Sequence, residues 1–336
     1  MKGRGHPVAD LLLIGYGERG RQWERALHRN GRFRLAGIVD TDESVRLPPH
    51  LGSIRCSQSI GDGIAATEAR AAIVASPPEY HERQAGECLT TGLTVLVEKP
   101  LSTSLASAAR VAAASESSGR VALVGQNFRF LAREHFVQRA LPEIGPLAGG
   151  LVSSARPGFV ARPHVRATEF GAMWDICLHH FDAIRMRFGA PEIVEGEMRS
   201  PGGWPGHATF DVELCWSNGA RIRYHHSEGA PGFHHLEYIE GRQGAIKVDD
   251  QRVYLAPSGR PPRRLMSARK PRDPHDVILD ALAAASLGSK PAQLSAHENL
   301  TTVAIAEAVQ VAMTEGRPVA IREITERARV SLDEVA

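Results

Sequence analysis

A glycine-rich turn close to the N-terminus limits the possible folds more than any other feature of the chain. An apolar run over residues 8–14 leads directly into it, and a helical pattern over residues 18–30 overlaps its end. The turn has the spacing G-x-G-x-x-G, with the residues Gly15, Tyr16, Gly17, Glu18, Arg19 and Gly20. The first glycine permits a tight turn, the second lets a pyrophosphate approach the backbone, and the third lets helix and strand pack closely. Between a strand and a helix, this spacing predicts a dinucleotide-binding loop with the phosphates at the helix N-terminus.

An acidic residue supports this prediction. A turn that needs glycines for its backbone alone would show the same spacing, and Arg19 could either flank the pyrophosphate or lie exposed. Asp40, however, ends the second predicted strand at the distance from the third glycine that the motif requires. A carboxylate there accepts hydrogen bonds from the ribose hydroxyls and repels a 2′-phosphate. Asp42 and Glu43 follow, and the next basic residue is Arg46, so we expect NAD rather than NADP.

The first 125 residues alternate predicted strands with predicted helices. Apolar runs typical of strands buried on both faces lie at residues 8–14, 35–39, 71–75, 94–97 and 121–124. Helical patterns lie at residues 18–30, 79–91 and 105–118, and two prolines in residues 45–49 predict a loop. Such repetition gives a parallel sheet with right-handed crossovers. We therefore predict an NAD-binding Rossmann domain, a doubly wound α/β sheet, over residues 1–125.

The second part of the chain has a different pattern, in which strands dominate. Strand-like stretches lie at residues 147–155, 193–199, 209–216, 220–226, 235–240 and 245–248. Helices are expected at residues 174–188, 276–286 and 295–315, and an exposed loop at residues 263–272. This pattern predicts an α+β domain with an open, mostly antiparallel sheet over residues 126–336. Two domains agree with a length of 336 residues, given about 150 residues per domain.

Composition excludes several classes of protein. Lys plus Arg number 40 and Asp plus Glu number 38, giving a net charge of +2, and no long run of like charge suggests a nucleic-acid partner. No apolar run near the start approaches the ~20 residues of a membrane span, and no signal peptide is recognisable. The four cysteines are scattered without a C-x-x-C pair, which predicts neither a disulfide framework nor a thiolate zinc site. We expect a cytoplasmic protein with no metal.

Further motifs follow the glycine loop and Asp40 in a fixed order. They are Ser76-Pro77-Pro78 with His81, Glu98-Lys99-Pro100, the run Gly125-Gln126-Asn127-Phe128-Arg129-Phe130, and Asp175 with His179 and Asp182. With these motifs the chain resembles the Gfo/Idh/MocA oxidoreductase family over nearly its whole length. The resemblance implies an NAD-dependent dehydrogenase or reductase acting on a CH–OH group of a sugar, a glycoside or a cyclitol.

The resemblance also implies roles for individual residues. Ser76, Pro77 and Glu98 would line the cofactor, and His81 would lie near its nicotinamide half. Lys99 would lie between nicotinamide and substrate, with Asn127 and Arg129 close by. Asp175 and His179 would be the catalytic pair. Trp174 or Trp204 could stack on a sugar ring, although core packing is the commoner use of a tryptophan.

Lys99 has a physical interpretation of its own. Proline at position 100 disfavours helical geometry at the residue before it, which keeps the strand end extended. In the place that the resemblance implies, between nicotinamide and substrate, an ammonium would stabilise negative charge on the carbinol oxygen. The alternative is a solvated lysine at a strand end, the commonest fate of this residue type.

Asp175, His179 and Asp182 share one face of a predicted helix. At 100° per residue, their offsets of four and seven residues place His179 about 40° ahead of Asp175 and Asp182 about 20° behind it. The stripe could bind a metal, could be a structural polar face, or could serve catalysis. An imidazole with an ordinary pKa near 6.5 suits proton transfer at neutral pH. Because the resemblance implies that Asp175 and His179 are the catalytic pair, we expect His179 to move the proton and Asp175 to orient the imidazole or to bind a sugar hydroxyl.

Departures from the family pattern fall on the substrate side. Cys177 stands where the family commonly has glycine, Phe128 where it often has arginine, and Phe170 where it commonly has glycine. The substrate therefore stays open. Two other activities also stay open: an NAD-dependent glycosidase that oxidises its substrate transiently, and a silent ligand-sensing regulator. The resemblance further implies a homodimer or homotetramer formed through the C-terminal sheet.

Overall fold

The computed structural model describes residues 9–157, 168–200, 207–266, 271–289 and 292–333. The chain forms two compact units, described one at a time below. The first unit comprises Met1–Asn127 with Arg272–Leu300, and the second comprises Phe128–Pro271 with Thr301–Ala336. Residues 272–300 therefore belong to the N-terminal unit, whereas they were predicted to lie in the second domain.

A six-stranded parallel sheet forms the centre of the first unit. The strands lie in the order β3-β2-β1-β4-β5-β6, and every neighbouring pair runs parallel. They are β1 Ala9–Ile14, β2 Phe33–Val39, β3 Arg55–Ser57, β4 Ala71–Val74, β5 Thr94–Val97 and β6 Ala122–Val124. This is the doubly wound sheet that was predicted. Its order reverses between β1 and β4, and ligands of such sheets bind beside this point at the carboxyl ends of the strands.

Helices connect these strands. They are α1 Glu18–Asn30, α2 Ile60–Ala65, α3 His81–Thr90 and α4 Leu105–Ser118, with α8 Pro274–Ser286 added from the later segment. Neither β3 nor α2 was predicted from the sequence. The strand has only three residues, and the helix contains Gly61 and Gly63, which have low helix propensity. Tertiary packing and the Ser59 cap, which accepts a hydrogen bond from the Asp62 N–H at 3.1 Å, stabilise α2 instead.

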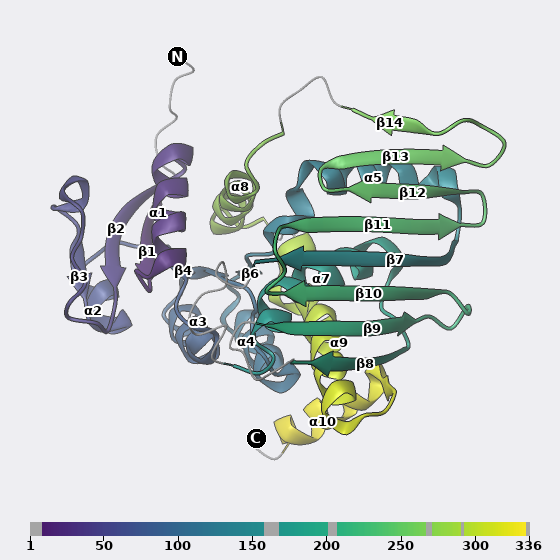
Figure 1. Ribbon diagram of the computed structural model, residues 1–336. Helices are drawn as coiled ribbons and strands as arrows, with labels where there is room; N and C mark the ends of the chain where they lie inside the picture. The colour runs from purple at the N-terminus through teal and green to yellow at the C-terminus, as the bar shows by residue number, and fades with distance from the viewer. Residues whose placement is uncertain (1–8, 158–167, 201–206, 267–270, 290–291, 334–336) are drawn as a thin grey trace. The chain divides into compact units, whose positions relative to one another are not determined.

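A nine-stranded sheet dominates the second unit (Figure 1). Its order is β14-β13-β12-β11-β7-β10-β9-β8-β15, and neighbours are antiparallel except β7 and β10, which run parallel. The strands are β7 Leu147–Arg156, β8 Ile193–Arg199, β9 Ala208–Cys215, β10 Arg221–Glu228, β11 His234–Gly241, β12 Gly244–Asp249, β13 Arg252–Pro257, β14 Arg263–Leu265 and β15 Val319–Ala320. The mostly antiparallel sheet was predicted. The segment that begins at Arg263, expected to be a loop, opens with the edge strand β14.

Helices cover one face of this sheet (Figure 1). They are α5 Ala132–Ile144, the π-helix η5 Met173–Cys177 continuing into α7 Leu178–Phe188, the later part of α9 Ala296–Glu315, and α10 Ile321–Asp333. Side chains that alternate toward the helices, such as Phe210, Ile222 and Ile239, are fully buried. These apolar residues form the core of the second unit.

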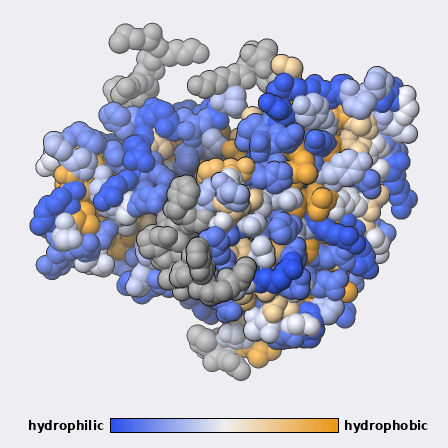
Figure 2. Space-filling view, in the orientation of Figure 1, coloured by the Kyte–Doolittle hydropathy of each residue, from blue (hydrophilic) through white to orange (hydrophobic). Residues whose placement is uncertain are grey.

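The opposite face of the sheet is not covered by these helices. On this face the outward positions of β9 and β10 hold charged side chains such as Glu213 and Arg223. Exposed apolar residues occur instead on β7 and β11, at Leu151 and Tyr238. Figure 2 shows hydrophilic and hydrophobic residues interspersed over the surface on this side.

Candidate active site

The glycine loop of the first unit leaves open space where a cofactor could lie. Gly15 has φ +84°, and a Cβ there would lie 2.7 Å from the Ser76 nitrogen. A Cβ on Gly20 would lie 2.0 Å from the Gly15 carbonyl oxygen, so helix and turn tolerate no side chain. At Gly17, by contrast, a Cβ would meet no atom of the described residues within 4 Å. Gly17 also begins α1 without a side-chain cap, which leaves helix N–H groups available to phosphates.

Asp40 is held in position at the end of β2. Its Oδ2 accepts the Tyr16 N–H at 2.7 Å, and its Oδ1 accepts the Asp42 N–H at 3.0 Å. Each oxygen keeps a lone pair for a ribose hydroxyl. The nearest basic side chain in the sequence after it, Arg46, donates to the carbonyl oxygens of Glu43 and Val45 rather than toward Asp40. Arg19 donates to Gln22 at 2.8 Å, within its own helix.

Two backbone carbonyl groups fix the His81 ring inside the first unit. His81 is 1% exposed, with Nδ1 at 2.8 Å from the Pro100 carbonyl oxygen and Nε2 at 2.9 Å from the Ser76 carbonyl oxygen. Burial lowers the pKa of His81, against the opposing effect of these two backbone oxygens. The ring therefore joins the segment after β4, which contains Ser76 and Pro77, to the segment after β5.

Glu98 and Lys99 are fixed by the same part of the first unit. Glu98 Oε1 accepts the Trp23 indole N–H at 2.7 Å, and Oε2 accepts the Lys99 backbone N–H at 3.1 Å. Lys99 is 6% exposed, so the interpretation as a solvated lysine is wrong. Lys99 thus lies buried directly after β5, at the carboxyl edge of the sheet.

In the second unit, the polar stripe at residues 175–182 serves two different ion pairs. Asp182 accepts two hydrogen bonds from Arg129, both at 2.7 Å, and one from Thr302 at 2.6 Å. Burial alone would raise the pKa of Asp182, but the hydrogen bonds and charge of Arg129 outweigh it and lower the pKa. Arg129, predicted to lie near the substrate, thus has a protein partner at two of its nitrogens.

Asp175 has a partner that was not predicted from the sequence. Arg156, the last residue of β7, donates from Nη1 to Asp175 Oδ2 at 2.9 Å and from Nε to Glu228 at 2.7 Å. Arg156 and Glu228 are paired positions of the parallel strands β7 and β10. Both residues occupy core-facing positions of strands that otherwise alternate between apolar and polar side chains. A charged residue at such a position is the sequence feature that could have predicted this ion pair.

His179 lies one turn beyond Asp175 and is buried. Its imidazole stacks on the Phe128 ring, with centroids 4.1 Å apart and an interplanar angle of 8°. The helix starts as a π-turn at residues 173–177, a geometry frequent at functional sites, where α-helix was expected. Phe128, which stands where the family often has arginine, therefore places an aromatic ring against the predicted proton-transfer group.

The tryptophans give a mixed result. Trp174 is buried and donates from its indole N–H to Gln310 at 2.6 Å, which favours packing over sugar stacking. Trp204 lies outside the described residues. The adjacent histidines of β10 point to opposite faces of the sheet. His225 lies on the outer face with its Nδ1 2.7 Å from Asp211 Oδ1, and His226 is buried. Within the described ranges, no group of three or more His, Cys, Asp or Glu is arranged to hold a metal.

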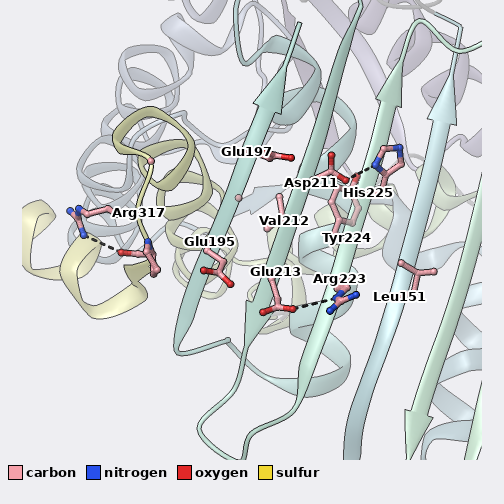
Figure 3. A pocket seen from close by; sticks show the side chains of 13 residues that line it. Leu151, Glu195, Glu197, Asp211, Val212, Glu213, Arg223, Tyr224, His225 and Arg317 are labelled. Carbon is pink, nitrogen blue, oxygen red and sulfur yellow. Dashed lines mark hydrogen bonds and ion pairs between the residues drawn. The ribbon is translucent and has the colours of Figure 1, made fainter. Parts of the chain in front are cut away.

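A hollow of about 670 Å³ lies on the outer face of the second sheet (Figure 3). Charged side chains line it, including Glu213 with Arg223 and Asp211 with His225, together with Arg317. None of the predicted site residues belongs to its lining. In the described part of the chain, no helix combines the length and apolar character needed to cross a bilayer.

Comparisons with known proteins agree with this arrangement. The model of an oxidoreductase family with an NAD-binding Rossmann fold matches residues 10–126. D-apiose dehydrogenase of Paraburkholderia graminis is 26% identical over 257 residues, 69% of this chain and 68% of that protein. Two other curated relatives are matched over only 52% and 57% of their length, so the chain spans about half of them.

Solved structures show the same fold over nearly the whole chain. A candidate NADPH-dependent oxidoreductase from Desulfitobacterium hafniense has a TM-score of 0.84 at 18% identity, covering 95% of this chain and 99% of that one. An oxidoreductase from Agrobacterium radiobacter, in complex with NAD⁺, L-tartaric acid and magnesium, has a TM-score of 0.82 at 20% identity, covering 94% and 99%. Identities this low establish the fold alone.

Proposed function

The chain belongs to the Gfo/Idh/MocA family of NAD-binding oxidoreductases, and we propose from this premise that it transfers a hydride between NAD and a secondary alcohol or ketone. The proposed substrate is a sugar, a glycoside or a cyclitol. The observation that carries the proposal is the buried Lys99 at the carboxyl end of β5, fixed through Glu98 and neighboured by the His81 link. One sugar-specific relative, D-apiose dehydrogenase, supports the substrate class.

The cofactor proposal is NAD bound at the glycine loop. The helix N-terminus at Gly17 would hold the pyrophosphate, and Asp40 would accept hydrogen bonds from the ribose hydroxyls. Ser76, Pro77 and Asn127 would line the rest of the cofactor. When bound, the nicotinamide supplies the acceptor or donor of the hydride.

The chain's own residues would handle charge and protons. Lys99 would stabilise negative charge on the carbinol oxygen as the C–H bond breaks. His179 would take the hydroxyl proton, or return it in the reverse direction. Asp175 would accept a hydrogen bond from a substrate hydroxyl. His81 and Arg129 are held by protein partners in supporting positions, so neither is proposed as a substrate contact.

A substrate panel tests the proposal. The purified protein with NAD is incubated with sugars, inositols and aryl glycosides, and NADH absorbance and aglycone release are followed together. We expect net NADH from at least one free sugar or inositol. Aglycone release without net NADH would identify a glycosidase instead, and binding of NAD without turnover of any compound would contradict an enzymatic role.

A further inference from the structure

Arg156 is the central member of a buried cluster behind Asp175. Its guanidinium bridges Asp175 and Glu228, so this trio carries two negative charges against one positive charge. Burial works to lower the pKa of Arg156, but the two carboxylates outweigh it and raise the pKa. The cation therefore persists throughout the pH range of an enzyme assay.

Further side chains hold the trio in place. His226 Nε2 lies 3.0 Å from Glu228 Oε2, and its Nδ1 lies 2.8 Å from Ser154 Oγ. Burial lowers the pKa of His226, so the ring is neutral at pH 7. A neutral ring that faces a carboxylate carries its hydrogen on that side, so Nδ1 accepts from the Ser154 hydroxyl. Glu228 thereby receives donors from two sides, which fixes the carboxylate that orients Arg156.

One donor of the cluster is unused. Nη2 of Arg156 is buried and has no hydrogen-bond partner among the residues described by the structure. Buried polar groups are rarely left without a partner in native proteins, and a ligand or a bound water usually supplies the missing one. This nitrogen belongs to the same guanidinium that binds Asp175, so a donor and an acceptor lie next to each other.

We propose, building on the proposed function, that Arg156 is the substrate-positioning residue of this enzyme. It holds Asp175 as an ionised acceptor and donates from Nη2 to an oxygen atom of the substrate. A hydroxyl group both donates and accepts, so it matches this pair. The excess negative charge of the trio disfavours a substrate that carries a carboxylate at that position. The site thus selects neutral hydroxylated compounds.

Of the titratable groups that the structure describes near the trio, His179 is the proposed proton carrier, and three others keep one charge state at neutral pH. Burial raises the pKa of Cys177 to about 12, and burial raises the pKa of Tyr224 well above its usual range. His180 is also buried, which holds its pKa well below the usual range. Removing Arg156 takes away the cation that bridges Asp175 and Glu228, and two neighbouring carboxylates repel each other, which raises the pKa of at least one of them.

The test compares three variants in the NAD-dependent assay. Arg156→Gln removes the donor and the cation, Arg156→Lys keeps the cation without the fork, and Arg156→Gln with Glu228→Gln removes the donor together with one carboxylate. Arg199→Gln is the control, because Arg199 lies in an exposed ion pair with Asp211. Melting temperature and NAD affinity by calorimetry are measured for each variant, so that a folding defect is recognised.

We expect Arg156→Gln to raise KM for the best neutral substrate of the panel by about 10–100-fold, the range for a lost hydrogen bond to a charged group. Its kcat/KM should also fall below neutral pH, with an apparent pKa above that of wild type, because Asp175 becomes protonated. The double variant should recover the wild-type pH profile while KM stays high. Arg156→Lys should keep the profile with an intermediate KM.

Substrate charge provides a second readout. With glucose and glucuronate as a matched pair of probes, or the active sugar and its uronate, wild type should favour the neutral compound by at least about tenfold in kcat/KM. Wild-type KM and pH profile in Arg156→Gln, or equal use of both probes by wild type, would overturn this inference alone. Absence of NADH from every compound with wild type would overturn the proposed function, and the inference with it.

Discussion

Single residues carry the proposed chemistry, and Lys99 is the most telling of them. Buried lysines are uncommon in proteins, yet Lys99 is 6% exposed and its backbone is fixed by Glu98. We predict that Lys99→Ala lowers kcat by about 10²–10³-fold, the effect of losing one preorganised charge-stabilising donor. For His179→Ala we expect a loss of about 10²–10⁴-fold, typical of general acid–base catalysis.

Both substitutions should leave NAD affinity, measured by calorimetry, nearly unchanged, because the two residues act after the cofactor has bound. The double variant should lose less than the product of the single losses, since the two side chains serve one oxyanion and one proton. Near-normal turnover of His179→Ala across the pH range would show that the histidine is structural. Loss of NAD binding in both variants would place them in the cofactor pocket instead.

Asp40 gives a second prediction at the residue scale. Backbone N–H groups of Tyr16 and Asp42 donate to its two oxygens, so the position of the carboxylate is fixed. We expect wild type to use NAD better than NADP in kcat/KM under one saturating substrate. Asp40→Ser combined with Glu43→Arg should shift the preference toward NADP, because the repulsion of the 2′-phosphate is removed. Equal or better use of NADP by wild type would contradict this interpretation of Asp40.

At the scale of elements, the ion pair that joins α7 to the segment before α5 is the clearest source of stability. Asp182 is buried and accepts two hydrogen bonds from Arg129. Asp182→Asn would leave the guanidinium buried without its carboxylate, which costs about 3–5 kcal/mol. Chemical denaturation should report a loss of unfolding free energy in this range, whereas Asp62→Asn, on the exposed part of α2, should change it little.

The same pair predicts the direction of acid destabilisation. The pKa of Asp182 is lowered in the folded protein, so its contribution is complete above the unfolded value of about 3.9. It is lost as pH falls through the lower folded value, because protonation breaks the pair. In Asp182→Asn, the fall of unfolding free energy between pH 5 and pH 2 should be shallower than in wild type. An identical slope would show that other carboxylates account for it.

Elements with regular apolar patterns were predictable, and those built by tertiary contacts were not. The strands around the glycine loop are continuous apolar runs, so β1, β4 and β5 were found within a residue or two. Helix α5 was missed because it is rich in charge and contains Pro142. The pairing of Arg156 with Glu228 joins residues 72 positions apart, and only the register of β7 and β10 brings them together. That register could not be predicted from the sequence around either residue.

At the scale of the whole molecule, the outer face of the nine-stranded sheet is the surface at which we expect copies of the chain to associate. Leu151 on β7 and Tyr238 on β11 are paired positions, and both are exposed on this face. Exposed apolar residues on a broad sheet favour a partner surface, and a second copy related by a two-fold axis is the simplest one. The charged residues of β9 and β10 would then lie beside this apolar centre, where opposite charges can pair between copies.

We therefore predict a dimer, or a tetramer containing such a dimer, at micromolar concentration by sedimentation velocity. Tyr238→Lys with Leu151→Lys should shift the protein to monomer, because two added like charges would be buried without partners at such an interface. Val330→Glu is the matched control: Val330 is an exposed apolar residue on α10, away from the sheet's outer face, and its replacement should leave the mass unchanged. A monomeric wild type would contradict the prediction. A double variant that stays associated with wild-type mass would show that a different surface joins the copies.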